Sequence, residues 1–117
     1  MEMTDPDTIV AALSALAQPH RLAAFRALVE AGPEGLSAGA MATRLGLPAS
    51  SLSFHLAQLE RSNLVIRRRA GRSLIYSADF AAMTALVGYL TENCCGGTDC
   101  ASNSVDPLTT EAQRKVA

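Results

Sequence analysis

Tryptophan is absent from the sequence, and the other aromatic side chains are few, three Phe and two Tyr. Aromatic residues make up 4% of the 117 residues, whereas apolar residues as a whole make up 49%. A chain of this length fits one domain, and its apolar content is enough to form a core. That core must be largely aliphatic, and the abundance of Leu and Ala favours packed helices.

Long apolar runs are also missing. No stretch approaches the roughly 20 apolar residues that a membrane-spanning helix requires. The first eight residues, MEMTDPDT, are acidic and lack the basic-then-apolar order of a secretory signal peptide. We therefore expect a cytoplasmic protein, in which thiols stay mostly reduced.

Cysteine is confined to one short segment. TENCCGGTDC contains Cys94, Cys95 and Cys100, and the chain has no other cysteine. In a reducing compartment, such a cluster indicates ligands or redox sensors rather than a structural disulfide. No C-x-x-C motif is present and the two histidines, His20 and His55, are distant in sequence, so a thiol enzyme fits poorly.

Charge is nearly balanced overall but unevenly distributed. The net charge is −1, yet residues 20–76 contain eight Arg and three Glu, a net +5, between flanks that each carry −3. A basic middle is typical of a protein that contacts a phosphate backbone through its centre, although an ordinary surface with uneven charge is the alternative. A protein-interaction module without nucleic-acid binding would leave these arginines unexplained.

Helical spacing of apolar residues predicts four helices before a strand-rich segment. The first begins after Asp5 as N-cap with Pro6 at its first position, and the second begins at Pro19. Residues 36–46 and 47–65 then predict two helices joined around Gly46, with Ser37 as a cap. Two helices joined by about three residues are typical of a helix-turn-helix.

A β-hairpin and a last helix follow the helix-turn-helix. The segment LVIRRRAGRSLIYSA has strand preference on both sides of Ala70-Gly71, which we place at the hairpin tip. Residues 79–93 predict the last helix, and Gly96-Gly97 would end any continuation. The predicted fold is mainly α with a small β-hairpin, a winged helix-turn-helix. We divide the chain into a DNA-binding and dimerisation domain, residues 1–92, and a C-terminal segment, residues 93–117.

The second helix of the helix-turn-helix has small polar side chains outside its leucine stripe. Hydroxyl, imidazole and amide groups can bond to phosphates or base edges in a major groove, although plain solvent-facing positions are the alternative. We expect Phe54 to pack in the core, against the wing, with exposure for contact with a thymine methyl as the alternative. The candidate DNA-binding residues here are Ser50, Ser51, Ser53, His55 and Gln58.

The hairpin contains Arg67, Arg68, Arg69 and Arg72. Four guanidinium groups around a tight turn repel one another unless an anion compensates them, and DNA phosphates supply that charge. Alternation along a strand sends Arg68 to the face opposite Arg67 and Arg69, where it would form a structural ion pair. Arg69 and Arg72 flank the tip, so we expect them to be the wing's DNA contacts.

Residues from about 10 to 90 resemble the ArsR/SmtB family of metal-responsive winged-helix repressors. The segments that carry the resemblance are LSALAQPHRLAAFRALVE and MATRLGLPASSLSFHLAQLERSNLVIRRRAGRSLIYSA. The resemblance implies a homodimer formed by the first and last helices, a double-stranded operator with two half-sites, and release by a metal or metalloid. The matching positions are Arg21, Ser53, His55, Leu56, Leu59, Leu64, Val65, Gly71, Arg72 and Tyr76.

The chain departs from the family's known ligand sites. Where many relatives carry a C-x-C box, this chain reads GLSAGAMATRLG, and the last helix lacks the His/Asp set of zinc-sensing relatives. The remaining candidate site for a thiophilic ion is Cys94, Cys95 and Cys100, an arrangement similar to that of some arsenite-responsive relatives. Three thiolates saturate trivalent arsenic, whereas structural zinc usually takes four ligands. We expect As(III) as inducer, or Sb(III) by the same geometry, and no organic cofactor. A redox switch, zinc or cadmium sensing, and an incidental cluster without a ligand are the alternatives.

Overall fold

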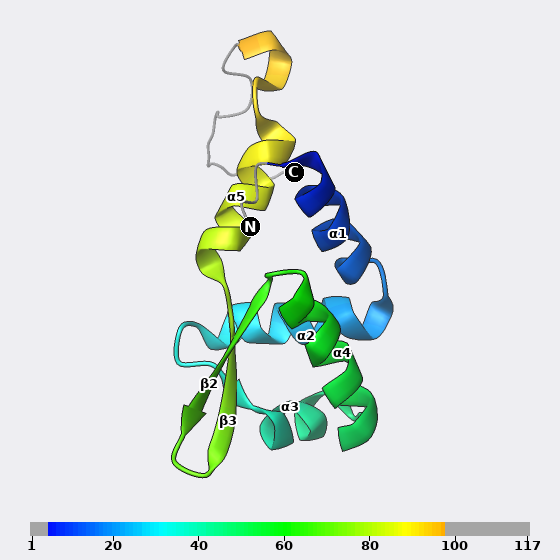
Figure 1. The fold of residues 1–117 in the computed structure, drawn as a ribbon, viewed down its shortest axis with the longest axis vertical. Helices are drawn as coiled ribbons and strands as arrows, with labels where there is room; N and C mark the ends of the chain where they lie inside the picture. The colour runs from blue at the N-terminus through cyan, green and yellow to red at the C-terminus, as the bar shows by residue number, and fades with distance from the viewer. Residues whose placement is uncertain (1–4, 98–117) are drawn as a thin grey trace, which may run out of the picture. The chain divides into compact units, whose positions relative to one another are not determined.

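The computed structural model describes residues 5–97, and within them the predicted winged helix-turn-helix order is confirmed (Figure 1). The elements are α1 (Pro6–Leu16), α2 (Pro19–Ala31), β1 (Leu36–Ser37), α3 (Ala38–Leu45), α4 (Ala49–Arg61), β2 (Val65–Ala70), β3 (Ser73–Ala78), α5 (Phe80–Thr91) and the 3₁₀ turn η1 (Cys94–Gly97).

The chain divides into two compact units, Met1–Val87 and Gly88–Ala117, with the boundary inside α5. The first unit holds α1 to α4, the sheet and the beginning of α5, and the second holds the end of α5 and η1. The functional boundary placed between residues 92 and 93 stays a prediction. Among the described residues, every helix is too short or too polar to cross a bilayer.

Local capping explains where the helices begin. The Asp5 carboxylate accepts a hydrogen bond from the Thr8 amide at 3.3 Å, and the Ser37 hydroxyl accepts one from the Ala40 amide at 3.1 Å. Both side chains satisfy amides that the first helical turn leaves without a backbone partner. The Asp79 carboxylate does the same for the Ala82 amide at 3.0 Å, so α5 starts one residue after the chain leaves β3.

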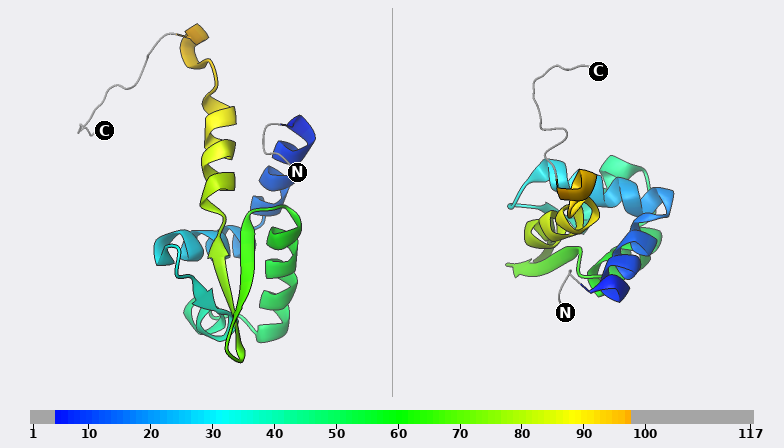
Figure 2. Two further views of the ribbon diagram at one scale, coloured as in Figure 1. Left: turned by 60° about the vertical axis from the view of Figure 1, so that its left-hand side comes forward. Right: turned by 90° about the horizontal axis from the view of Figure 1, so that it is seen from above.

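The sheet has one strand more than the predicted hairpin. β3 lies in the middle, pairing antiparallel with β2 on one side and with the two-residue strand β1 on the other. The register pairs Ala70 with Ser73, so the turn is Gly71–Arg72 rather than Ala70-Gly71. Gly71 has a φ of 65°, a left-handed conformation that glycine adopts readily. Figure 2 shows the hairpin extending beside α4, with its tip near α3.

The core of the first unit is aliphatic, as the composition predicted. α2 contacts α1, α3, α4 and β3 and crosses the middle of the unit in Figure 1. The helix-turn-helix packs on this helix through one buried stripe, and the chain leaving α4 adds to the same core. The largest fully buried side chains are Leu28, Met41, Leu52, Leu56, Leu59 and Leu64. Burial of this stripe fixes which side of α4 faces outward.

Candidate nucleic-acid interface and cysteine segment

The turn between α3 and α4 has helix-turn-helix geometry. Gly46 ends α3 in the left-handed conformation, with φ 67° and ψ 34°, and its amide bonds to the Ala42 carbonyl. Pro48 then adopts an extended conformation as the N-cap of α4 and accepts a hydrogen bond from the Leu52 amide at 3.0 Å. Because proline cannot continue the preceding helix, the two helices meet over three residues, as predicted.

The predicted DNA-binding positions of α4 lie outside its buried leucine stripe. Ser50 and Ser53 are exposed, whereas Ser51, His55 and Gln58 are half-buried. Ser50 and Gln58 lie opposite Leu52 and Leu56 around the helix, since neighbours on one face recur every three or four residues. The structure therefore brings hydroxyl and amide groups together on the outward face of α4.

Phe54 corrects the sequence analysis. Core packing was expected, but the side chain is 58% exposed. Its position follows from helical spacing, because residue 54 lies four positions after Ser50 and four before Gln58, on the face opposite the leucines. This periodicity was visible in the sequence and could have identified Phe54 as an outward-facing residue.

His55 lies at the edge of the outward face, against the start of α2. Its ring centroid is 5.6 Å from that of His20, and its Nδ1 atom is buried with no hydrogen-bond partner. Desolvation by burial lowers the pKa of His55, and the positive charge of Arg21 and the neighbouring His20 lower it further. These effects favour a neutral imidazole, which can donate one hydrogen bond and accept another.

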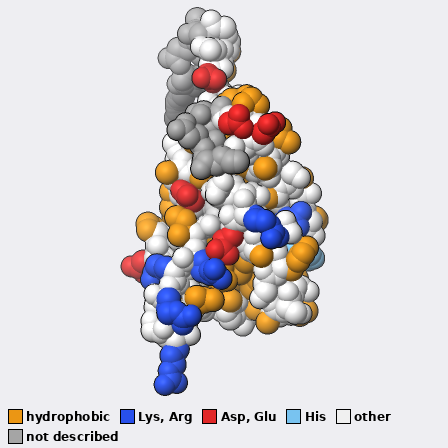
Figure 3. Space-filling view, viewed as in Figure 1, with side chains coloured by type: hydrophobic (Ala, Val, Ile, Leu, Met, Phe, Trp, Pro, Cys, Tyr) orange, Lys and Arg blue, Asp and Glu red, His pale blue; other side chains and the backbone are white. Residues whose placement is uncertain are grey.

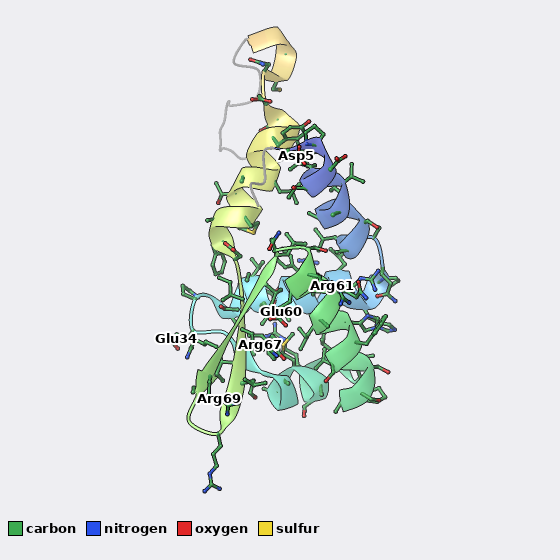
Figure 4. All side chains as sticks on the ribbon, viewed as in Figure 1. Asp5, Glu34, Glu60, Arg61, Arg67 and Arg69 are labelled. Carbon is green, nitrogen blue, oxygen red and sulfur yellow. The ribbon has the colours of Figure 1, made fainter. Side chains whose placement is uncertain are left out.

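The hairpin arginines fall into two pairs. Arg67 Nε lies 3.3 Å from a Glu60 carboxylate oxygen at the end of α4, and Arg68 donates to the Glu34 carbonyl oxygen at 2.8 Å (Figure 4). Arg68 thus binds a backbone carbonyl rather than the carboxylate that an ion pair would need. Neither Arg69 nor Arg72 has an ion pair or hydrogen bond among the described residues. Two guanidinium groups near the tip therefore remain available for phosphates.

Positive charge is concentrated on this part of the unit. Residues 38–78 contain six Arg and a single Glu, and that Glu is Glu60, already paired with Arg67. Figure 3 shows basic side chains gathered over the hairpin, one of them extending beyond its tip. Arg72 also borders a shallow pocket with Ser37 and the first turn of α3. An outward helix with hydrogen-bonding groups beside a basic hairpin is suited to a nucleic-acid groove.

The cysteine segment belongs to the second unit and leaves regular helix before the first thiol. α5 ends at Thr91, two residues before the predicted end, and Asn93 has a φ of 56°. Cys95 and Gly96 follow with left-handed φ values of 57° and 68° inside η1. On a regular helix, adjacent side chains point about 100° apart around the axis. Here the chain has left helical geometry, and the Sγ atoms of Cys94 and Cys95 lie only 3.6 Å apart.

Two thiolates that share one metal ion lie at most about 4.6 Å apart, twice the Zn–S distance of about 2.3 Å. The observed 3.6 Å separation is within that limit. Cys100 lies outside the described residues, and within residues 5–97 no group of three or more His, Cys, Asp or Glu side chains is placed to hold a metal ion. Cys95 is disulfide-bonded.

Residues 16–68 match the helix-turn-helix domain family. The nodulation protein NolR of Rhizobium meliloti is 36% identical over 88 residues, which cover 75% of this chain and 70% of that protein.

Solved structures give the same picture. An ArsR-like transcriptional regulator from Rhodococcus sp. RHA1 has a TM-score of 0.64 and 26% identity, covering 72% of this chain and 76% of that one. A homodimeric winged helix-turn-helix DNA-binding domain from Mycobacterium bovis has a TM-score of 0.59 and 28% identity, with 74% and 81% covered. The transcriptional repressor BigR from Xylella fastidiosa has a TM-score of 0.58 and 26% identity, with 74% and 87% covered.

The similarity to NolR, the winged helix-turn-helix fold and the basic face of α4 and the hairpin all indicate a DNA-binding regulator. The chain belongs to the ArsR family of winged helix-turn-helix transcriptional regulators, which bind DNA.

Proposed function

We propose that this protein is an arsenite-responsive repressor that binds operator DNA as a homodimer and is released when As(III) binds Cys94, Cys95 and Cys100. The observation that carries the proposal is the 3.6 Å separation of the Cys94 and Cys95 Sγ atoms in a segment that has left helical geometry. Two of the three cysteine sulfurs are thus close enough to share one ion once Cys95 is reduced to a thiol.

The choice of ligand follows from donor type and number. Thiolates are soft donors that prefer thiophilic ions, and the segment offers three of them. Trivalent arsenic has a lone pair and forms three bonds in a pyramid, so three thiolates complete its coordination. Antimonite has the same geometry and is the second candidate inducer. A tetrahedral zinc or cadmium site would need a fourth ligand that the cluster lacks.

The DNA contacts are assigned to α4 and the hairpin. Ser50, Ser53 and Gln58 would bond to base edges or phosphates from the outward face of α4, with Ser51 and His55 at its edges. Arg69 and Arg72 would contact phosphates, which is consistent with their having no ion-pair partner among the described residues.

Dimerisation is supported by apolar surface on the first unit. On α1, Val10 and Leu13 are 63% and 40% exposed, and Val87 of α5 is 55% exposed. Apolar side chains of α2 and α5, Phe25 and Leu86 among them, also line an open pocket of about 340 Å³. Exposed apolar surface of this kind is typical of an interaction site, and a second copy would cover it. The homodimeric relative from Mycobacterium bovis supports this assembly.

Release requires that the ion bind one state of the dimer more tightly than the other. Closing three thiolates on one ion would reshape the segment that follows α5. If α5 lies in the dimer interface, this change alters the spacing of the two α4 helices and the fit to two half-sites. The coupling is reciprocal, so operator DNA would weaken arsenite binding by the same factor.

The decisive experiment is fluorescence anisotropy on DNA from upstream of the protein's own gene. Arsenite is titrated under reducing conditions with the wild type and with the C94S/C95S/C100S variant. We expect the wild type to be released and the variant to stay bound. Continued binding of the wild type at saturating arsenite would overturn the proposal, and peroxide, zinc and cadmium would then be titrated in turn.

A redox-sensing repressor is the second candidate, favoured by the disulfide bond of Cys95. In this alternative, two thiols lose two electrons and two protons to an oxidant such as peroxide, and the disulfide replaces the ion as the signal. Single variants separate the two functions. Cys94→Ser should abolish an arsenite response but leave a disulfide switch at Cys95 intact, whereas Cys95→Ser should abolish both.

A further inference from the structure

Phe54 is exposed on a helix whose leucines are buried. Its side chain is 58% exposed, while Leu52, Leu56 and Leu59 of the same helix are at most 1% exposed. The exposed part of the ring stays in contact with water and adds no stability through burial in the fold. The intramolecular packing of the unit therefore does not explain why a large apolar group occupies this position.

The ring lies at the centre of the outward face of α4. Helical spacing places Ser50 one turn before it and Gln58 one turn after it. Its edge meets His55 with ring centroids 5.8 Å apart and an interplanar angle of 66°, a T-shaped arrangement that aromatic rings prefer. His55 in turn contacts His20 of α2, so the Phe54 ring has a neighbour that orients it.

The surroundings of Phe54 favour nucleic acid over protein as the group that covers it. Arg61 is exposed on the last turn of α4, and the helix's only acid, Glu60, is already paired with Arg67. Hydroxyl and amide groups flank the ring, and the basic hairpin contacts the helix through β2. A hydrophobic protein partner would instead meet a surface that is polar and positively charged around one ring.

One base-edge group in the major groove matches an apolar ring between hydrogen-bonding side chains. The thymine C5-methyl is apolar, and a phenylalanine contact with it distinguishes thymine from the other bases. We propose that Phe54 is a specificity-determining residue that contacts a thymine methyl in each operator half-site. This inference rests on the proposed DNA-binding surface and adds the base feature that it recognises; it is independent of the inducer.

The test removes the methyl group alone. Within the protected operator region, each thymine is replaced in turn by deoxyuracil, and affinity is measured for the wild type, Phe54→Ala and Phe54→Leu. We expect one position per half-site at which loss of the methyl weakens wild-type binding by about fourfold, the value of one buried methyl-sized group. Phe54→Ala should bind the thymine and deoxyuracil duplexes equally at that position, and Phe54→Leu should keep part of the difference.

Two results would overturn the inference. One is a deoxyuracil effect that is the same in the wild type and in Phe54→Ala at every position. The other is a change in oligomeric state of Phe54→Ala without any change in the deoxyuracil pattern, which would make this face a protein interface. Far-ultraviolet circular dichroism checks that both variants fold. If the wild type shows no preference for its operator over random DNA, the proposed function itself has failed, which is a separate outcome.

Discussion

Gly35 shows how one residue position fixes the start of the helix-turn-helix. Its φ is +75°, and a Cβ atom built there would lie 2.2 Å from the Tyr76 carbonyl oxygen. This close approach lets Leu36 pair with Tyr76, so that β1 joins the sheet immediately before α3 begins. A side chain at this position would force the two backbones apart.

We predict that Gly35→Ala destabilises the protein by on the order of 3–4 kcal/mol, because backbone strain adds to a steric clash.

Two matched controls separate these causes. Gly32 also has a positive φ, +81°, with a ψ of −168°, but open space around it, so Gly32→Ala should cost about 1–3 kcal/mol from backbone strain without a clash. Gly39 lies in α3 with open space and an ordinary φ, so Gly39→Ala should stabilise by about 0.5–1 kcal/mol. Urea unfolding measures all three, and equal losses for Gly35→Ala and Gly32→Ala would contradict the clash.

His55 predicts a pH dependence of folding. Burial, Arg21 and His20 lower the pKa of His55 below 6.5 in the folded state, so the unfolded chain binds a proton more readily. Stability from this group is therefore fully present above pH 6.5 and is lost as the pH falls through the folded pKa. We expect the free energy of unfolding to drop between pH 7.5 and 5.5 in the wild type and to drop less in His55→Gln. Parallel curves for the two proteins would rule out His55 as the source.

Some residue roles could be predicted from the sequence, and others depended on tertiary contacts. The caps Asp5 and Ser37 were predicted, because capping depends on neighbours within three residues. The histidine contact was missed, since it depends on how α2 packs against α4, and the two histidines are 35 positions apart in the sequence. Phe54 was assigned to the core on residue type, whereas helical spacing alone places it outside.

At the level of elements, the hairpin combines structural and exposed arginines. Arg67 joins β2 to α4 through Glu60, and Arg68 joins β2 to the backbone before β1. Alternation along the strand correctly separated Arg68 from Arg67, because side chains of successive residues point to opposite faces. The sequence could not show which residues Arg67 and Arg68 would contact on the two faces of the strand.

We predict that Arg72→Ala weakens binding to all DNA sequences by a similar factor and lowers the slope of log K against log salt concentration by about 0.9, the contribution of one phosphate contact. Arg68→Ala is the matched control, because its guanidinium already binds the Glu34 carbonyl, and its slope should stay at the wild-type value. Anisotropy titrations at several salt concentrations give both slopes. An unchanged slope for Arg72→Ala would remove the wing from the DNA-binding mechanism.

Strand β1 illustrates the limit of element prediction. Leu36 and Ser37 were assigned to the start of a helix, and Ser37 does cap α3. Two residues carry too little periodicity to indicate a strand, and their pairing with β3 spans about 40 residues of sequence. The hairpin tip shifted by one residue for a related reason, since cross-strand register sets the turn.

At the level of the whole molecule, the winged order could be predicted from the sequence because each element has its own local pattern and turn residues. The assembly could be expected only from the family resemblance. Val10 and Leu13 are exposed on α1, which makes this face of α1 the one that we propose for the dimer.

We predict that Leu13→Glu shifts the protein from dimer to monomer, because a buried unpaired carboxylate in an apolar interface is costly. Ser14→Glu is the control, since Ser14 is an exposed polar neighbour on the same helix and should leave the dimer intact. Sedimentation equilibrium measures the mass of each variant. A Leu13→Glu dimer of wild-type strength would place the interface elsewhere.

The paired sulfurs of Cys94 and Cys95, 3.6 Å apart, also determine how the proposed ion would be captured. Once two thiolates hold it, we propose that Cys100 of the same chain forms the third bond, because it follows Cys95 by five residues. A tether of this length keeps the third thiol at an effective concentration in the millimolar range. A monothiol in solution would have to reach a similar concentration to take the third position, so the response would tolerate competing thiols below that level.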